Sequence, residues 1–255
     1  MSIRLPEELI KQRVSEIQRD LLAQSHHLRA VNFTAIHLAD LEFLFNAYDM
    51  RFLGGLVRPA LAGHTLTFRL SPRMTHAGGK TTRRTTRTGD VRYEIAVASS
   101  MLFDAFADAD RGVSVAGLEC GNRLDALQRV MEHEMVHLIE QLCWKSSDCS
   151  ASRFQDMAAR IFRHRAHTHN LVTRRERASA AGIMVGSRVT FTFEDRRLTG
   201  RVNRITKRAT VLVEDPNGVR FSNGLRYKTY YVPIQWLKPA IATDPPSTSN
   251  LAEES

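Results

Sequence analysis

The sequence predicts an α+β fold in which a mainly helical domain with a small antiparallel sheet precedes a small, all-β, barrel-like module. Apolar residues recur at helical spacing over much of residues 1–172, whereas they alternate with polar residues in 185–239. The chain has 255 residues, of which 43% are hydrophobic, enough to bury one sizeable core and a second small one. We therefore expect a main domain with an appended module.

Composition divides the chain into five parts. The segment after His169 is first charged and then rich in small residues, which is typical of a linker. The last residues hold too little apolar content to fold. The expected parts are an N-terminal helical extension (1–36), a main domain (37–172), a linker (173–184), a basic β module (185–239) and a disordered tail (240–255).

Within the main domain, apolar spacing and turn residues mark the individual elements. Pro6 stands near the start of an amphipathic helix that we expect to pack against the domain from outside, and Gly54 and Gly55 end the following core helix. The runs "GKTTRRTTR" and "VRYEIAVA" flank the turn "TGD" and, with the strand before them, predict the small antiparallel sheet. The predicted helices cover residues 5–30, 38–52, 99–107, 124–143 and 153–162, and the first strand covers residues 65–70.

Four short β-rich runs fill the module: "RVTFTFED", "RLTGRVNRI", "RATVLVED" and "RYKTYYVP". Turns at "EDRR", "TK" and "DPNG" separate them, which favours a small barrel. Strand alternation places Val189, Phe191 and Val202 inside and basic side chains on one surface. We expect Tyr230 and Trp236 to belong to the barrel core, although exposed aromatic residues in this segment could stack on bases.

Positive charge is concentrated in two segments. The net charge is +9; residues 185–239 hold 11 Lys and Arg against 4 Asp and Glu, and residues 73–92 hold six against one. Clustered cations are typical of surfaces that bind phosphate backbones, the alternative being a solvated surface that aids solubility. We therefore expect DNA as a partner. The candidate nucleic-acid contacts are Arg83, Arg84, Arg201, Arg204, Lys207 and Arg208.

The cysteines and the apolar segments bear on the cellular compartment. Cys120, Cys143 and Cys149 are too few and odd in number to predict a disulfide framework, so we expect reduced thiols. No apolar run approaches the length of a transmembrane helix, and charges interrupt the N-terminal segment where a signal peptide would be apolar. We expect a cytoplasmic protein that does not bind membranes.

The segment "RVMEHEMVHLIEQL" carries the strongest chemical signal in the chain. In helical geometry His133 and His137 lie one turn apart on the same face, and Glu134 reaches the space beside that face. Two imidazoles in this arrangement bind a zinc ion, and the glutamate accepts a proton from the water that attacks a peptide carbonyl. The flanking apolar residues bury this helix, so its polar side chains need a partner, which favours a metal site over a chance match.

Four segments in order give residues 40–172 a resemblance to the SprT-like family of metallopeptidases, which includes Spartan. They are "LEFLFNAYDMRFLGGLV", "LTFRLSPRMTHAGGKT", "YEIAVASSML" and "VMEHEMVHLIE". The resemblance implies a minimal zincin-like fold, a zinc ion held by three histidines and a glutamate as general base. It assigns His133 and His137 as ligands and Glu134 as the base. The best-known members cleave proteins attached to DNA, which implies a role in the repair of DNA–protein crosslinks.

The third zinc ligand of the family has no direct counterpart here. The family supplies a histidine shortly before an aromatic residue, and if Phe154 is that aromatic residue, Ser150 stands at the position of the histidine. Cys149 is adjacent, and a thiolate is a strong zinc ligand, so Cys149 is one candidate. The alternatives are His164 and His169, which reach the ion only if the helix before them returns alongside the metal-binding helix.

These observations predict a zinc-dependent endopeptidase that acts on proteins bound to or near DNA. Members of the family often end in a zinc ribbon, which the basic β module replaces here, and this module is the expected nucleic-acid anchor. The alternative is a nucleic-acid-binding protein without peptidase activity, in which the zinc ion is structural. A site closed by four protein ligands, including both Cys149 and His164, would favour that alternative.

Overall fold

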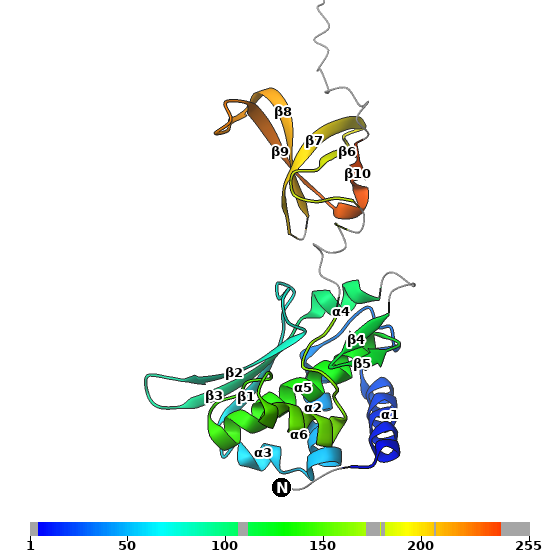
Figure 1. The fold of residues 1–255 in the computed structure, drawn as a ribbon, viewed down its shortest axis with the longest axis vertical. Helices are drawn as coiled ribbons and strands as arrows, with labels where there is room; N and C mark the ends of the chain where they lie inside the picture. The colour runs from blue at the N-terminus through cyan, green and yellow to red at the C-terminus, as the bar shows by residue number, and fades with distance from the viewer. Residues whose placement is uncertain (1–4, 107–111, 172–178, 180–181, 207, 241–255) are drawn as a thin grey trace, which may run out of the picture. The chain divides into compact units, whose positions relative to one another are not determined.

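The chain divides into two compact units, Met1–Val172 and Thr173–Ser255, and each is described by itself (Figure 1). Most of the expected linker and nearly all of the expected disordered tail lie outside the described residues, as does Lys207. The computed structural model describes residues 5–106, 112–171, 179, 182–206 and 208–240.

Helices make up most of the regular secondary structure of the first unit. The first helix, α1, covers Glu7–Gln24 and is shorter than predicted, because the chain becomes extended at Ser25. Its buried residues belong to the same core as the rest of the unit. Within the described part of the chain, no helix combines the length and the apolar character that crossing a membrane requires. The other helices are α2 (Leu38–Leu53), α3 (Val57–Ala60), α4 (Ser99–Ala105), α5 (Arg123–Trp144) and α6 (Ser152–Phe162).

A three-stranded sheet lies beside the helices, with strand order β1-β3-β2. The prediction of an antiparallel sheet is wrong for one pair, because β1 runs parallel to β3. β2 and β3 form the predicted hairpin, but β3 lies in the centre and leaves β2 at the edge, packed against α5. A short hairpin of β4 and β5 was not predicted. The strands are β1 (Thr65–Leu70), β2 (Gly79–Thr85), β3 (Val91–Val97), β4 (Val113–Val115) and β5 (Leu118–Cys120).

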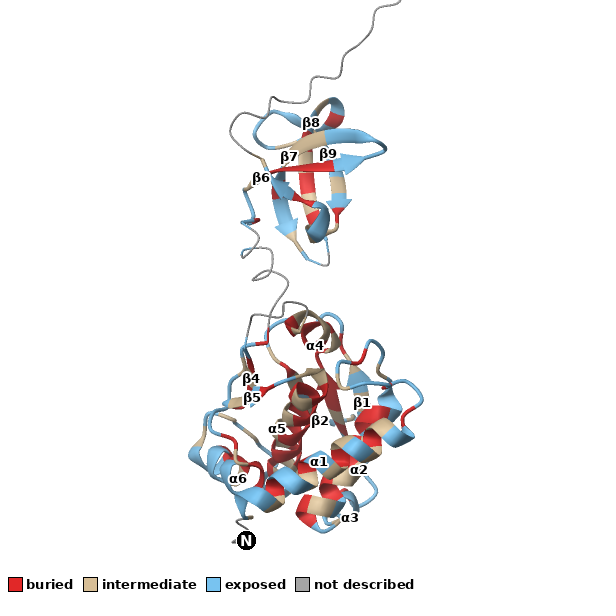
Figure 2. Cartoon of the chain, turned by 90° about the vertical axis from the view of Figure 1, so that its right-hand side faces the viewer, coloured by how far each residue is buried: buried red, intermediate tan, exposed pale blue. Residues whose placement is uncertain are grey.

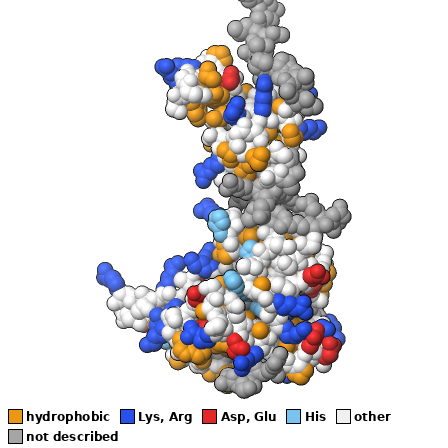
Figure 3. Space-filling view, in the orientation of Figure 1, with side chains coloured by type: hydrophobic (Ala, Val, Ile, Leu, Met, Phe, Trp, Pro, Cys, Tyr) orange, Lys and Arg blue, Asp and Glu red, His pale blue; other side chains and the backbone are white. Residues whose placement is uncertain are grey.

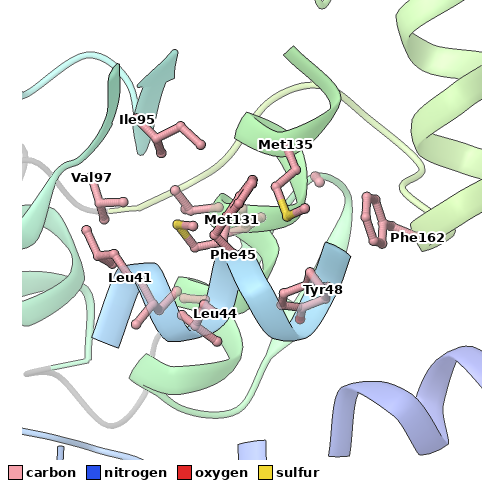
Figure 4. Close-up of a cluster of buried hydrophobic side chains, with 14 of the residues drawn as sticks. Leu41, Leu44, Phe45, Tyr48, Ile95, Val97, Met131, Met135 and Phe162 are labelled. Atoms are coloured by element: carbon pink, nitrogen blue, oxygen red, sulfur yellow. The ribbon is translucent and has the colours of Figure 1, made fainter. Parts of the chain in front are cut away.

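Helix α5 is buried along much of its length (Figure 2). Apolar side chains from α2, β3 and α6 pack around it, and each fully buried side chain of this size contributes about 1.5–3 kcal/mol relative to exposure. This packing fixes the helix that carries the H-E-x-x-H motif. Figure 4 shows Leu41, Leu44, Phe45 and Tyr48 of α2, Met131 and Met135 of α5, Ile95 and Val97 of β3, and Phe162 of α6.

A buried ionic network joins α2, α5 and the segment after α6. The carboxylate of Glu132 accepts hydrogen bonds from Tyr48 Oη at 2.8 Å and Arg129 Nη1 at 2.7 Å. On its other oxygen it lies 2.9 Å from His164 Nε2. Burial alone would raise the pKa of Glu132, but the charge of Arg129 and the hydrogen bond from His164 outweigh it and lower this pKa. Glu132 is therefore a charged group whose partners compensate its loss of hydration.

We expect Glu132→Ala to lower the free energy of unfolding by about 3–5 kcal/mol, because it leaves the partly buried Arg129 without its counter-charge. The matched control is Asp156→Ala, which removes an exposed carboxylate paired with Arg160 and should cost less than about 1 kcal/mol. Urea unfolding of both variants measures the difference. Equal losses would show that the network contributes no more than a surface ion pair.

The second unit is a five-stranded antiparallel sheet in the order β10-β6-β7-β8-β9. The prediction of a barrel is wrong, because no pairing closes the sheet between its edge strands β9 and β10 within the part of the unit that is described. Val189, Phe191 and Val202 are buried in its core. The strands are β6 (Arg188–Phe193), β7 (Arg196–Ile205), β8 (Ala209–Arg220), β9 (Arg226–Val232) and β10 (Lys238–Pro239).

Two features of the module differ from the sequence-based expectations. The "DPNG" segment lies inside β8, where the pairing with β9 shifts register between Glu214 and Val219. Gly218 allows this, because a Cβ there would lie 2.4 Å from the backbone carbon of Tyr227. The expectation of a core position is wrong for Trp236, whose side chain is 62% exposed, whereas Tyr230 packs against the core.

Candidate active site

Helix α5 places two histidines side by side. His133 and His137 lie one turn apart, and their Nε2 atoms are separated by 3.2 Å. The loop after α5 brings Cys149 to them, so that the three side chains offer ligand atoms within 4.8 Å of one another. Two nitrogens on one tetrahedral zinc ion are about 3.3 Å apart, given Zn–N bonds of about 2.0–2.1 Å. This donor set fits a metal ion and leaves one coordination position for another ligand.

A chain of hydrogen bonds holds His137 in place. Its Nδ1 lies 2.6 Å from Ser147 Oγ, which donates to Glu140 Oε2 at 2.6 Å. The other oxygen of Glu140 accepts a bond from Arg153 Nε at 2.7 Å. Because the Ser147 hydroxyl donates its proton to Glu140, it accepts a hydrogen bond from Nδ1 of His137. The lone pair of His137 is therefore on Nε2. Such partners orient a metal-binding histidine and fix its tautomer.

Burial keeps both imidazoles in the neutral form that binds metal ions. It lowers the pKa of His133 to about 3, with the neighbouring histidines adding to the shift. Burial also lowers the pKa of His137, although the carboxylates of Glu140 and Asp148 oppose it. The ring of Phe154 packs against both, with centroid distances of 4.8 Å and 4.5 Å. A metal ion therefore has no proton to displace from either histidine.

Glu134 lies against strand β2. Its Oε2 accepts a hydrogen bond from Thr81 Oγ1 at 2.8 Å. The strand approaches so closely that a Cβ on Gly79 would lie 2.6 Å from Oε1 of Glu134, so glycine is required here. Burial raises the pKa of Glu134 to about 7, and the bonds from Thr81 counteract it only in part. A carboxyl group with this pKa can take up and release a proton near neutral pH.

The three candidate metal ligands and Glu134 line one cleft of about 450 Å³. Its lining also includes the turn and strand from His76 to Thr81 and the segment from His167 to His169. Glu134 is the only carboxylate among the lining residues, so the rim of the cleft is neutral or basic. Figure 3 shows histidine side chains of the first unit beside a run of Lys and Arg side chains.

The structure distinguishes the three predicted candidates for the third ligand. His164 is turned toward Glu132, 2.9 Å from its carboxylate, although its ring stacks 6.4 Å from the ring of His133. His169 lines the cleft but does not belong to the ligand group. Among the residues that the structure describes, Cys149 completes the group with the two histidines.

Cys149 stands on a loop that Gln155 of α6 holds in place. Gln155 Nε2 lies 3.4 Å from the backbone oxygen of Cys149 and 3.0 Å from that of Ser150. The thiol is half-buried, and burial raises its pKa. Binding a metal ion would therefore require this thiol to lose its proton, which a divalent cation favours.

Sequence reasoning missed the side chains that support the site. A signal existed for Glu140, which follows His137 by three positions and so lies on the same side of the helix. Thr81 and Ser147 gave no such signal, because each reaches α5 only through the fold.

The candidate nucleic-acid residues fall on both units. Arg83 and Arg84 lie on β2, next to the residues that line the cleft, and Arg84 is directly opposite Arg92 of β3. Arg83 is half-buried and Arg84 is exposed. The exposed candidates of the second unit are Arg201, Arg204 and Arg208.

We expect Ser147→Ala to weaken zinc binding by about 10–100-fold, because His137 loses the partner that fixes its tautomer. Ser146→Ala is the matched control, since Ser146 is exposed in the same loop and should keep wild-type affinity. Competition with a zinc-binding dye measures both constants. Equal affinities for the two variants would remove Ser147 from the site.

Comparisons of the chain with protein-family models, with curated proteins and with solved structures find no match. The resemblance to the SprT-like family therefore rests on the four sequence segments alone.

Proposed function

We propose that this protein is a zinc-dependent endopeptidase, as in the SprT-like family, that acts in the cytoplasm on proteins bound to or near DNA. The observation that carries the proposal is the buried carboxylate of Glu134 beside a three-ligand group in an open cleft. Three protein ligands and one open position are typical of catalytic zinc sites, whereas structural sites have four protein ligands. The first unit would then be a minimal zincin-like domain.

The chain's own side chains supply the proton transfer. Bound zinc would act as a Lewis acid that polarises the scissile carbonyl and stabilises the charge that develops on it. Glu134 accepts a proton from the attacking water and donates it to the amide nitrogen as the C–N bond breaks. A pKa of about 7 serves both halves of this transfer at neutral pH. The hydroxyl of Thr81 keeps the carboxylate in place between the two events.

Strand β2 suits the cleft to a peptide substrate. Within the part of the chain that the structure describes, it pairs with β3 alone, and its first residues line the cleft. Gln141 Nε2 donates to Thr81 O at 3.3 Å, so a main-chain acceptor of β2 points toward α5 and the cleft. An extended peptide can add to such an edge through main-chain hydrogen bonds, which bind many sequences. This supports a protein substrate over a small molecule.

The alternative function is nucleic-acid binding with a structural zinc ion and no catalysis. A closed site would need both Cys149 and His164 on the same ion. His164 is instead hydrogen-bonded to Glu132 in a buried network. His164 lies outside the group formed by His133, His137 and Cys149, and this group of three ligands favours the open, catalytic site.

We expect Glu134→Gln to lower the rate of casein cleavage by about 10²–10⁴-fold while zinc content and thermal stability are kept, because the amide has nearly the same shape and cannot accept the proton. The control is Glu119→Gln, an exposed change on β5 that should leave the rate unchanged. Cleavage by the Glu134 variant at the wild-type rate would show that this residue is not the general base.

Purified protein should contain about one zinc ion per chain, and His133→Ala should lose it, because two ligands cannot hold the ion against a chelator. His76→Ala is the control, since His76 is exposed at the cleft but lies outside the ligand group. Elemental analysis after dialysis against a weak chelator gives the metal content. Retention of zinc by the His133 variant would refute the site.

A further inference from the structure

Strand register sorts the side chains of the second unit between two faces of its sheet. Val202 and Val211 are paired across β7 and β8 and belong to the core. Arg201 is opposite Leu212, which is in turn opposite Thr229 of β9. Because successive side chains of a strand point to opposite faces, these three lie on the face away from the core, which we call the outer face.

A β-bulge brings a second arginine to the outer face. Arg201 and Arg204 are three positions apart, which in a regular strand puts two side chains on opposite faces. The pairing of β7 with β8 shifts between Val202 and Arg204, so that Asn203 is an extra residue and Arg204 comes to lie opposite Thr210. Bulges re-aim side chains in this way and are frequent beside functional sites.

The aromatic side chain of Tyr231 completes the same surface. Tyr231 on β9 is opposite Thr210, so it lies in one cross-strand row with Arg204. Its side chain is 65% exposed. Because neighbouring strands lie about 4.8 Å apart, the backbones of Arg204 and Tyr231, two strands apart, are separated by about 10 Å. We define the outer-face patch as Arg201, Arg204, Thr210, Leu212, Thr229 and Tyr231.

The two arginines of the patch are available to an external anion. Both are exposed, and neither forms an ion pair within the described residues of the chain. The six residues of the patch include no carboxylate, and Glu214, the next outer-face residue of β8, borders it opposite Tyr227. Lys228, on the opposite face of β9, is paired with Asp215 at 2.7 Å. Each guanidinium therefore keeps donors for two bonds to one phosphate group.

We propose that the outer-face patch binds single-stranded nucleic acid, with Arg201 and Arg204 on phosphates and Tyr231 stacked on an unpaired base. Interleaved cations, hydroxyls and an exposed aromatic ring are typical of surfaces that follow a strand in this way. An anionic membrane would require projecting aliphatic side chains beside the cations, and Leu212 is half-buried. The inference deepens the proposed function, on which it rests for its biological role, because it names the surface that would hold the peptidase near its substrates.

The test is a salt titration of the binding of full-length protein to a fluorescent oligothymidylate, followed by anisotropy. Arg201→Glu/Arg204→Glu should weaken binding at least about tenfold and lower the salt slope by about 1.4, the value for two phosphate contacts. The matched control, Arg196→Glu/Arg220→Glu, makes the same change in net charge at exposed positions outside the patch. It should weaken binding less than about threefold. Tyr231→Ala should weaken binding at least about fivefold without changing the slope.

Three outcomes would overturn the proposal. The two pairs of arginine substitutions could lower the affinity for the oligothymidylate equally, or a duplex of the same length could bind as tightly. The third is tighter binding to vesicles with 30% phosphatidylserine. Arg201→Gln/Arg204→Gln, which avoids new negative charge, must also weaken binding if the fold is kept. Zinc content and casein cleavage are measured on the same proteins. If the wild-type protein cleaves casein but does not bind the oligothymidylate, only this inference fails. If it binds the oligothymidylate but does not cleave casein, only the peptidase proposal fails.

Discussion

Helix α5 buries three carboxylates, Glu132, Glu134 and Glu140, and the first unit is arranged so that each of them has a partner. A charged carboxylate taken out of water costs several kcal/mol unless hydrogen bonds and opposite charges compensate it. The partners come from α2, from strand β2, from the loop after α5 and from α6. The hydrogen bonds and ion pairs of the three carboxylates therefore join those elements to α5. Together with the apolar packing around α5, these contacts position the candidate metal ligands.

The three carboxylates differ in how far their partners compensate the loss of hydration, and this difference separates their roles. Glu132 has a guanidinium, a phenol and an imidazole around it, and these lower its pKa. Glu140 has the guanidinium of Arg153 and the hydroxyl of Ser147, and it acts on the site only through His137. Among the described residues, Thr81 alone donates to the carboxylate of Glu134 and no cation lowers its pKa, so burial prevails and this pKa rises to about 7. The carboxylate left least compensated by the protein is the one that faces the cleft, where a proton can be exchanged with a substrate.

Local pattern predicts the elements well and their pairing poorly. The apolar spacing around His133 and His137 predicts α5 almost to its ends, because the apolar residues that bury one face of a helix all lie in one continuous segment. The parallel pairing of β1 with β3, the arrival of Cys149 beside the histidines and the bond from Thr81 to Glu134 each join distant segments, and no local period encodes them. The bulge at Asn203 shows the same limit on a smaller scale, because one extra residue reverses the face on which Arg204 lies.

Gly78, just before β2, and Gly79, its first residue, have a mechanical consequence. A Cβ on Gly78 would lie 3.0 Å from Val130 Cγ2, and one on Gly79 would lie 2.6 Å from the carboxylate of Glu134, so the backbone here packs directly against side chains of α5. Such close packing opposes a hinge motion between β2 and α5. We therefore expect the edge of the sheet and Glu134 to move together. Control of this site would then act most readily at the entrance of the cleft, by covering or filling it, because the close packing at its floor resists rearrangement.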